Sequence, residues 1–295
     1  MSSILQQLLN GLALGSTYAL LALGIAIVFS IIGLANFAHG ELITICAYVM
    51  LAMRYAGMPW ILWVAAGLVV TVLAALLMER LAFRPVRHAS PITMLMASLG
   101  LSILIASAFE AFVSPRVRAV PQPDWMNSTL TVLGLQVRLS YLLVIGVTAV
   151  ALIGLLTLLR RTVVGIAMRG AAEDFDAVRL MGVKANFVVA FSFAISGFLA
   201  GLAAVLILSL RGAVSPHMGF ALVLNGFMAN VIGGLGNLWG AVLGGFILGF
   251  LETVFRAFLP TQATGFTNGL IFLIIGIILI LRPDGLIAPK RAVRV

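Results

Sequence analysis

Long runs of apolar residues, separated by short polar breaks, dominate the pattern of this chain. Stretches without Asp, Glu, Lys or Arg are about as long as the roughly 20 residues that a helix needs to cross the hydrocarbon core of a membrane. The pattern therefore predicts a bundle of membrane-spanning helices. These stretches cover residues 4–40, 55–78, 88–109, 139–159, 185–210, 212–251 and 257–281.

Turn residues inside these runs indicate where individual helices end. The tripeptide GMP at 57–59 separates a short segment near 37–53 from a full span near 60–80, and GGLGN at 233–237 divides a 40-residue uncharged stretch. Residues 114–138, rich in Pro and polar groups, form the longest loop of non-helical character. We predict an all-α polytopic bundle with eight crossings, or nine if the short segment also crosses.

Composition and charge agree with a membrane protein. The chain is 62% hydrophobic and only 9% charged, whereas roughly 25% of the residues in a soluble domain carry a charge. A net charge of +9 would indicate nucleic-acid binding in a soluble chain. Here the basic residues lie between apolar runs, which the positive-inside rule explains. We expect one transmembrane domain, 1–295, surrounded by lipid and without a nucleic-acid partner.

Three clusters of basic residues predict which side of the membrane is cytoplasmic. An even number of spans separates each cluster from the next, so all three, including the C-terminus, can face the cytoplasm. The loop 114–138 then faces outward, and the side of the N-terminus depends on the ambiguous segment after Gly33. The clusters are Arg80, Arg84 and Arg87; Arg160, Arg161, Arg169, Arg179 and Lys184; and Arg282, Lys290, Arg291 and Arg294.

Residues 160–186 combine charged and apolar side chains on the predicted cytoplasmic side. The pattern favours a short amphipathic helix from about Ile166 to Met181 that stops at Gly182. One interpretation is a helix that lies on the lipid headgroups. Docking to a protein partner is the sharper hypothesis, because three acids are unfavourable beside an anionic leaflet. The candidate residues are Arg169, Glu173, Asp174, Phe175, Asp176, Arg179, Met181 and Gly182.

Three polar residues, Asn36, His39 and Glu41, interrupt the apolar pattern between Gly33 and Tyr48. In a structural reading they form a capped helical hairpin at the membrane surface, with Asn36 as a cap and Glu41 at the positive helix end. In a functional reading the break lies within the membrane and lines a path for polar solutes. The depth of the break decides between these readings. Asn225 and Asn230 are further candidates for such a path.

Glycines at four-residue spacing, Gly236, Gly240 and Gly244, predict a smooth stripe on which a neighbouring helix packs closely. Stripes of this kind are common in membrane bundles, so we interpret this one as helix packing. A helix pair that slides during a transport cycle is the alternative.

The sequence lacks the common signatures of catalysis and metal binding. It contains no phosphate-binding loop, zinc-protease helix or nucleophile elbow. Cys46 is the only cysteine, and the three histidines have no ligand-like spacing. Glu41, Glu110 and Glu252 fall near predicted span ends, although an ion-coupled carrier usually places such a group deeper. We predict a chain that is not an enzyme and whose energy source is external.

Four motifs in order, "GLANFAHGELI", "TVVGIAMRGAAEDFDAVRLMGV", "GGLGNLWGAVLGG" and "LRPDGLI", resemble the LivH-like permease subunits of branched-chain amino acid ABC importers. The similarity extends from about Gly11 to Leu286. It implies a type II-like importer in the bacterial inner membrane, and it implies that the helix at Gly165–Gly182 couples the permease to an ATPase. The implied partners are a paralogous LivM-like permease, two cytoplasmic LivG/LivF-like ATPases that hold ATP and Mg, and a periplasmic amino acid binding protein.

The resemblance also leaves alternatives open. Members of this family transport urea, short amides or aromatic acids as well, and this chain is expected to bind no cofactor itself. Arg116, Arg118 and Arg211, in outward loops, are candidates for docking the binding protein. A stand-alone channel or secondary carrier is one rival. A membrane-embedded enzyme built on the Asn36, His39 and Glu41 group is another.

Overall fold

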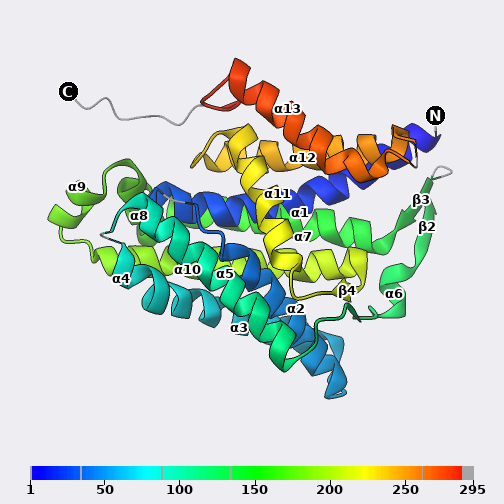
Figure 1. Ribbon diagram of the computed structural model, residues 1–295, viewed down its shortest axis with the longest axis horizontal. Coiled ribbons are helices and arrows are strands. Elements are labelled where there is room, and N and C mark those ends of the chain that lie inside the picture. The colour runs from blue at the N-terminus through cyan, green and yellow to red at the C-terminus, as the bar shows by residue number, and fades with distance from the viewer. Residues whose placement is uncertain (1, 34, 88, 133–134, 261, 288–295) are drawn as a thin grey trace.

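A computed structural model of the chain describes residues 2–33, 35–87, 89–132, 135–260 and 262–287. Long helices run roughly along the longest axis of the molecule, and the small elements gather at its two ends (Figure 1). The elements are α1 (Ser2–Ile32), α2 (His39–Tyr55), α3 (Trp60–Met78), the π-helix η1 (Glu79–Phe83), α4 (Arg84–Val86), α5 (Pro91–Phe112), β1 (Arg118–Ala119), α6 (Asp124–Asn127), β2 (Thr129–Val132), β3 (Leu135–Arg138), α7 (Leu139–Arg161), α8 (Val163–Glu173), α9 (Phe175–Leu180), α10 (Ala185–Arg211), β4 (Ala213–Val214), α11 (Met218–Gly233), α12 (Leu238–Phe258), the 3₁₀ helix η2 (Thr264–Phe266) and α13 (Thr267–Leu281).

In the described part of the chain, seven helices are long and apolar enough to cross a membrane. Two further helices, α2 with 17 residues and α11 with 16, are shorter than the roughly 20 residues that a crossing needs. The all-α polytopic fold is therefore confirmed, and the number of crossings stays a prediction. The seven spans are Ile4–Ile32, Trp60–Val86, Pro91–Phe112, Leu139–Arg161, Ala185–Arg211, Leu238–Phe258 and Thr264–Leu281.

The helices α1 and α10 form the centre of the bundle, and small residues let their neighbours come close. Gly11 and Gly15 of α1 face the aromatic rings of Phe250 and Phe246 on α12, while Gly245 and Gly249 of α12 face the backbone of α1. On α10, Gly197 packs against Ala75 of α3. Without a side chain at these positions, backbones approach closely and gain van der Waals contact.

The glycines predicted to form one stripe divide between two structural roles. Gly240 and Gly244 lie on the face of α12 that packs against the backbone of α11, at Gly233 and Ala229. Gly236, in contrast, precedes the helix and adopts φ +79° in the turn after α11. A left-handed residue of this kind favours glycine for its backbone conformation, so Gly236 does not belong to the packing stripe.

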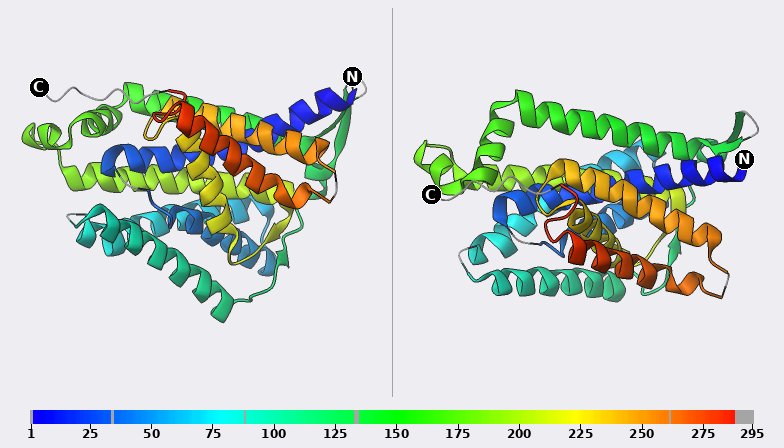
Figure 2. Two further views of the ribbon diagram at one scale, coloured as in Figure 1. Left: turned by 45° about the horizontal axis from the view of Figure 1, so that its top comes forward. Right: turned by 90° about the horizontal axis from the view of Figure 1, so that it is seen from above.

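The two ends of the bundle differ in composition. One end, which we call the hairpin end, holds the N-terminus of α1 and the antiparallel pair β2–β3, in which Thr129 lies opposite Arg138. The opposite end, the α8–α9 end, holds these two short helices and the junction of η1 with α4 (Figure 2). Residues 114–138, predicted as a non-helical loop, contain β1, α6 and this hairpin, and β1 pairs with β4.

Two of the basic clusters predicted to share one side lie together at the α8–α9 end. A cavity of about 820 Å³ there is lined by Arg84 and Arg87 from the first cluster and by Arg179 and Lys184 from the second. In the third cluster, Lys290, Arg291 and Arg294 lie outside the described residues. Because the hairpin end holds the N-terminus, the structure places that terminus opposite the basic clusters.

Residues 160–186 contain two helices, α8 and α9, so the prediction of one helix from Ile166 to Met181 was wrong. Asp174 adopts an extended conformation between α8 and α9, and its Oδ1 accepts a hydrogen bond from the Ala177 backbone N–H at 2.9 Å. An aspartate in this position caps a new helix start. The predicted stop is confirmed, because Gly182 has φ +83° directly after α9.

Candidate functional site

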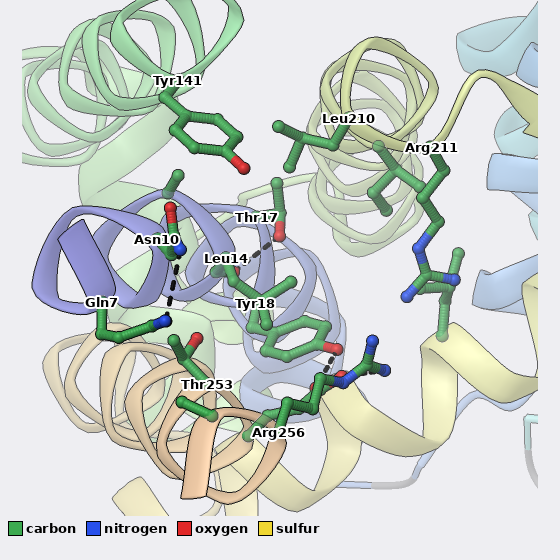
Figure 3. A pocket seen from close by; sticks show the side chains of 15 residues that line it. Gln7, Asn10, Leu14, Thr17, Tyr18, Tyr141, Leu210, Arg211, Thr253 and Arg256 are labelled. Atoms are coloured by element: carbon green, nitrogen blue, oxygen red, sulfur yellow. Dashed lines mark hydrogen bonds and ion pairs between the residues drawn. The ribbon is translucent and has the colours of Figure 1, made fainter. Parts of the chain in front are cut away.

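A polar pocket opens at the hairpin end, between the ends of four long helices and the side of α11 (Figure 3). Its volume is about 390 Å³, within the range of small-molecule sites. Polar groups and an apolar wall both contribute to the lining. The lining residues are Gln7, Asn10, Ala13, Leu14, Thr17, Tyr18, Tyr141, Ile207, Leu210, Arg211, Leu222, Glu252, Thr253, Arg256 and Ala257.

A buried carboxylate forms the floor of this polar pocket. Glu252 is only 3% exposed, and its carboxylate pairs with the Arg256 guanidinium at 2.6 Å, one helical turn further along α12. The Tyr18 hydroxyl donates a hydrogen bond to the other oxygen of Glu252 at 2.5 Å. It also accepts a hydrogen bond from the Asn225 amide of α11 at 3.2 Å. Tyr18 thus joins α1, α11 and α12 in one network of hydrogen bonds around a buried carboxylate.

A second cation, Arg211, lies on the opposite wall at the C-terminal end of α10. Figure 3 shows its guanidinium directed toward the Tyr18 hydroxyl and Arg256. Within the described residues Arg211 forms no ion pair, whereas Arg256 is paired with Glu252. The two arginines and one glutamate of the polar pocket therefore leave one positive charge without a counter-ion among the described residues.

The polar break between α1 and α2 lies deep in the bundle and not at its surface. The Ser196 hydroxyl, from the middle of α10, lies 3.0 Å from Nδ1 of His39 and donates to the Gly24 carbonyl of α1 at 2.8 Å. His39 is 1% exposed. Because Gly24 and Ser196 belong to the central parts of two long helices, the break lies inside the bundle, which favours the interpretation that it lies within the membrane.

Asn36 does not cap α2, so the capping role predicted for it is wrong. The residue before α2 is Ala38, and no side chain caps this helix start. The Asn36 Oδ1 is buried without a hydrogen-bond partner, although its backbone carbonyl accepts from the His39 N–H at 3.3 Å. The helix instead begins against another backbone, because Gly40 packs directly on Gly219 at the start of α11.

The side chains of His39 and Glu41 contact different neighbours. His39 faces Ser196 of α10, whereas the Ser102 hydroxyl of α5 donates to Glu41 Oε1 at 2.8 Å. A catalytic constellation needs its groups around one shared point, and these two diverge. Within the described residues, moreover, His, Cys, Asp and Glu form no group of three that could hold a metal. The geometry gives no support to a membrane-embedded enzyme.

The two asparagines predicted for a path both lie on α11 and contact α1. Asn225 reaches the polar pocket through Tyr18, and the Asn230 amide donates to the Ala22 carbonyl at 2.9 Å. They are separated from the His39 and Glu41 contacts on α10 and α5. The five candidates therefore divide between the buried break and the α1–α11 contact, and of these only Asn225 bonds to a residue that lines the polar pocket.

The residues predicted for partner docking lie at the α8–α9 end with different exposures. Arg169, Glu173, Asp174 and Arg179 are exposed, and Phe175 packs partly against the core. Met181 is 75% exposed, and Leu180 beside it is 88% exposed. Asp176 lies in α9 and Gly182 follows it. The tip of this segment thus presents two large apolar side chains away from the bundle.

Sequence reasoning missed the polar pocket as a unit. It assigned Glu252 to a span end and Arg211 to an outward loop, and it did not single out Tyr18 or Arg256. The spacing of Glu252 and Arg256, one turn apart in an apolar run, was an available signal for an ion pair. No comparable signal pointed to the contribution of Tyr18, because 234 residues separate it from Glu252.

The fold and the site together define a multi-pass membrane protein with a polar cavity at one end and an exposed apolar tip at the other. Residues 7–281 match the family model described as the branched-chain amino acid transport system/permease component. The chain therefore belongs to this permease family, and the sequence-based identification of the family is confirmed.

Relatives over the full length agree with this assignment. The chain is 33% identical to the high-affinity branched-chain amino acid transport system permease protein LivH of Escherichia coli K12, over 99% of this chain and 97% of the relative. It is 31% identical to the corresponding protein BraD of Pseudomonas aeruginosa, over 99% and 98%. A shorter match, 31% identity over 32% of this chain, is to the ribose import permease protein RbsC of Haemophilus influenzae.

Proposed function

We propose that this chain is the permease subunit of an ATP-binding-cassette importer and forms half of a translocation path for branched-chain amino acids. The observation that carries the proposal is the full-length match to permeases of branched-chain amino acid transport systems. A second permease of LivM type would supply the other half. The protein would lie in the inner membrane, with lipid around its outer helices.

The basic clusters support a cytoplasmic location for the α8–α9 end and for the C-terminus. The hairpin end and the N-terminus then face the periplasm, where a binding protein would deliver the solute. Arg116 and Arg118, in the segment that contains β1, stay candidates for contact with that protein. The polar pocket would open toward the delivered solute.

Energy would come from two ATPase subunits of LivG/LivF type that bind ATP and Mg, while this chain binds no cofactor. We assign their docking to the α8–α9 tip, since Leu180 and Met181 are largely exposed and such a pair suits an apolar cleft on a partner. When the ATPases close, they would push α8 and α9. A few kcal/mol of differential binding is enough to shift a two-state bundle between its openings.

Transport measurements on reconstituted complexes test this function directly. Proteoliposomes with this chain, the second permease, both ATPases and the binding protein from the same genome should accumulate labelled leucine only with ATP and the binding protein. Competition by valine and isoleucine, against urea, short amides and aromatic acids, would separate the solute classes. Leucine uptake by vesicles with this chain alone would favour a channel or carrier and contradict the proposal.

A second measurement tests the docking of the ATPases. The double substitution Leu180→Asp and Met181→Asp should abolish co-purification of the ATPases, because each aspartate would have to be buried in an apolar contact. The matched control is Val117→Asp, which changes a residue that is 66% exposed near the hairpin end and should retain them. If the ATPases co-purify equally with both variants, the docking assignment is wrong.

A further inference from the structure

The polar pocket combines features that fit one chemical class of ligand, an amino acid with an apolar side chain. Arg211 provides an unpaired guanidinium, and the Glu252–Arg256 pair provides a buried carboxylate. Leu14 and Leu222 add apolar surface to the lining of the same pocket. A zwitterion of that kind carries one carboxylate, one ammonium group and a hydrocarbon portion, and each has a counterpart in the pocket.

We infer that the polar pocket is a solute-receiving site inside this single subunit, with Arg211 as the group that binds the solute's carboxylate. The inference rests on the proposed function, since it gives the orientation of the pocket. It goes beyond a path that runs only between two permease subunits, because five helices of one chain surround this pocket.

Arg211 suits this role because it forms no ion pair within the described residues and its side chain is exposed to solvent. A guanidinium offers two parallel N–H donors that match a carboxylate. Arg256 is less available, because Glu252 holds it at 2.6 Å. Each Glu252 oxygen already has one partner, Arg256 or Tyr18. A carboxylate oxygen can accept a second hydrogen bond, so Glu252 can still act as the anionic acceptor for an incoming ammonium group. A solute without a carboxylate would leave the Arg211 guanidinium without an anionic partner.

The residues at the floor of the pocket link it to helices at the centre of the bundle. The Tyr18 hydroxyl joins Glu252 to Asn225 of α11. The start of α11, in turn, packs at Gly219 against Gly40 of α2. An ammonium group that bonds to Glu252 would therefore contact a residue whose hydrogen-bond network already joins α1, α11 and α12. Such a contact needs only modest strength, since a transported solute must also leave.

Thiol protection tests the site without any need for transport. Leu14→Cys places a thiol in the pocket wall, and the native Cys46 is fully buried, so the new thiol is the accessible one. In the purified complex with both permeases and the ATPases, millimolar leucine should slow modification by a thiosulfonate reagent several-fold. Leucinamide, which lacks the carboxylate, should not. Adding Arg211→Gln should remove the protection by leucine, and adding Arg138→Gln, on the exposed N-terminal side of α7, should keep it.

Equal protection by leucine and leucinamide, or protection that survives Arg211→Gln, would overturn the inference. Complexes of the Arg211→Gln variant that retain their composition and their ATP hydrolysis would show that the bundle is intact. Because this assay measures binding alone, it stays informative even if the wild-type proteoliposomes import no leucine. The failure of the proposed function and the failure of this site are therefore distinguishable.

Uptake measurements separate this role from docking of the binding protein. At saturating loaded binding protein, Arg211→Gln should lower the rate of leucine uptake about tenfold, the effect of losing one charged hydrogen bond. Arg211→Lys should restore part of the rate, since lysine keeps the positive charge but lacks the two parallel N–H donors of the guanidinium. The affinity of the binding protein for the complex should stay within about twofold of wild type. A lost affinity with a normal saturated rate would show that Arg211 docks the binding protein, and the inference would be wrong.

Discussion

The most apolar 18-residue windows of α1 and α5 have the same mean hydropathy, 2.1, yet 83% of the window in α1 is buried inside the bundle and only 22% of the window in α5. Moving an apolar side chain from lipid to protein yields little free energy, so hydropathy does not select the inner helices. The difference lies in small and polar residues. Gly11, Gly15 and Gly24 of α1 each touch a neighbouring helix, whereas Gly100 of α5 faces open space.

Close backbone contacts, not hydrophobicity, therefore place a helix at the centre of this protein. This interpretation can be tested with pairs of matched substitutions, one on an inner helix and one on an outer helix. The buried thiol of Cys46 offers a common measurement, because its reaction with a maleimide during heating reports loss of the packed bundle in every variant.

The largest effect is expected for Gly40→Leu at the crossing of α2 and α11. Any side chain at Gly40 would overlap the Gly219 backbone, and backbone cannot move aside as a flexible side chain can. We expect a loss of more than about 3 kcal/mol, the upper end of overpacking costs, seen as an absence of monodisperse protein. Gly100→Leu on α5 should leave the thiol as protected as in wild type. Similar behaviour of the two variants would contradict the distinction between inner and outer helices.

A smaller loss is expected for Leu20→Ala on α1, where the side chain is fully buried. The cavity left behind should cost about 3 kcal/mol, as in other core positions. Leu104→Ala on α5, where the side chain is 65% exposed, should change stability by less than about 0.5 kcal/mol. The temperature of half-maximal Cys46 modification compares the two, and equal shifts would speak against the comparison.

Tyr18→Phe should cost about 2 kcal/mol, because it removes a hydrogen bond to the buried Glu252 carboxylate. The matched control is Tyr141→Phe on α7, since the Tyr141 hydroxyl lines the polar pocket without a hydrogen bond to another described residue. This control should be neutral in the same thermal assay. A neutral Tyr18→Phe would mean that the α1–α12 contact depends on glycine packing alone.

The smallest effect is expected for Ser196→Ala, which removes the donor to Gly24 and the partner of His39. Hydrogen bonds between membrane helices contribute about 0.6 kcal/mol on average, so a shift of about 1 kcal/mol is the upper expectation. Thr157→Ala on α7, whose hydroxyl bonds only within its own helix, serves as the control. A loss comparable to that of Leu20→Ala would give this polar contact more weight than packing.

Much of the fold was predictable from the apolar runs, and parts of the site were not. The spans near 60–80, 92–112 and 139–159 correspond to α3, α5 and α7. The division at 233–237 and the stop at Gly182 follow local turn chemistry. The break at Asp174 was missed, because an aspartate in a helical pattern becomes a cap only when the backbone before it turns away.

The class of protein follows from the amino-acid sequence, because apolar runs of roughly 20 residues and the placement of arginines between them depend only on the chain and the bilayer. The family follows from the sequence as well, through motifs that extend along nearly the whole chain. The burial of the break after α1 and the contacts of Tyr18 with Glu252 and Asn225 could be found only in the folded structure. Both features depend on contacts between residues far apart in the chain. In a membrane such contacts follow from the close approach of helix backbones. A local pattern of apolar and polar residues does not predict which helices approach one another.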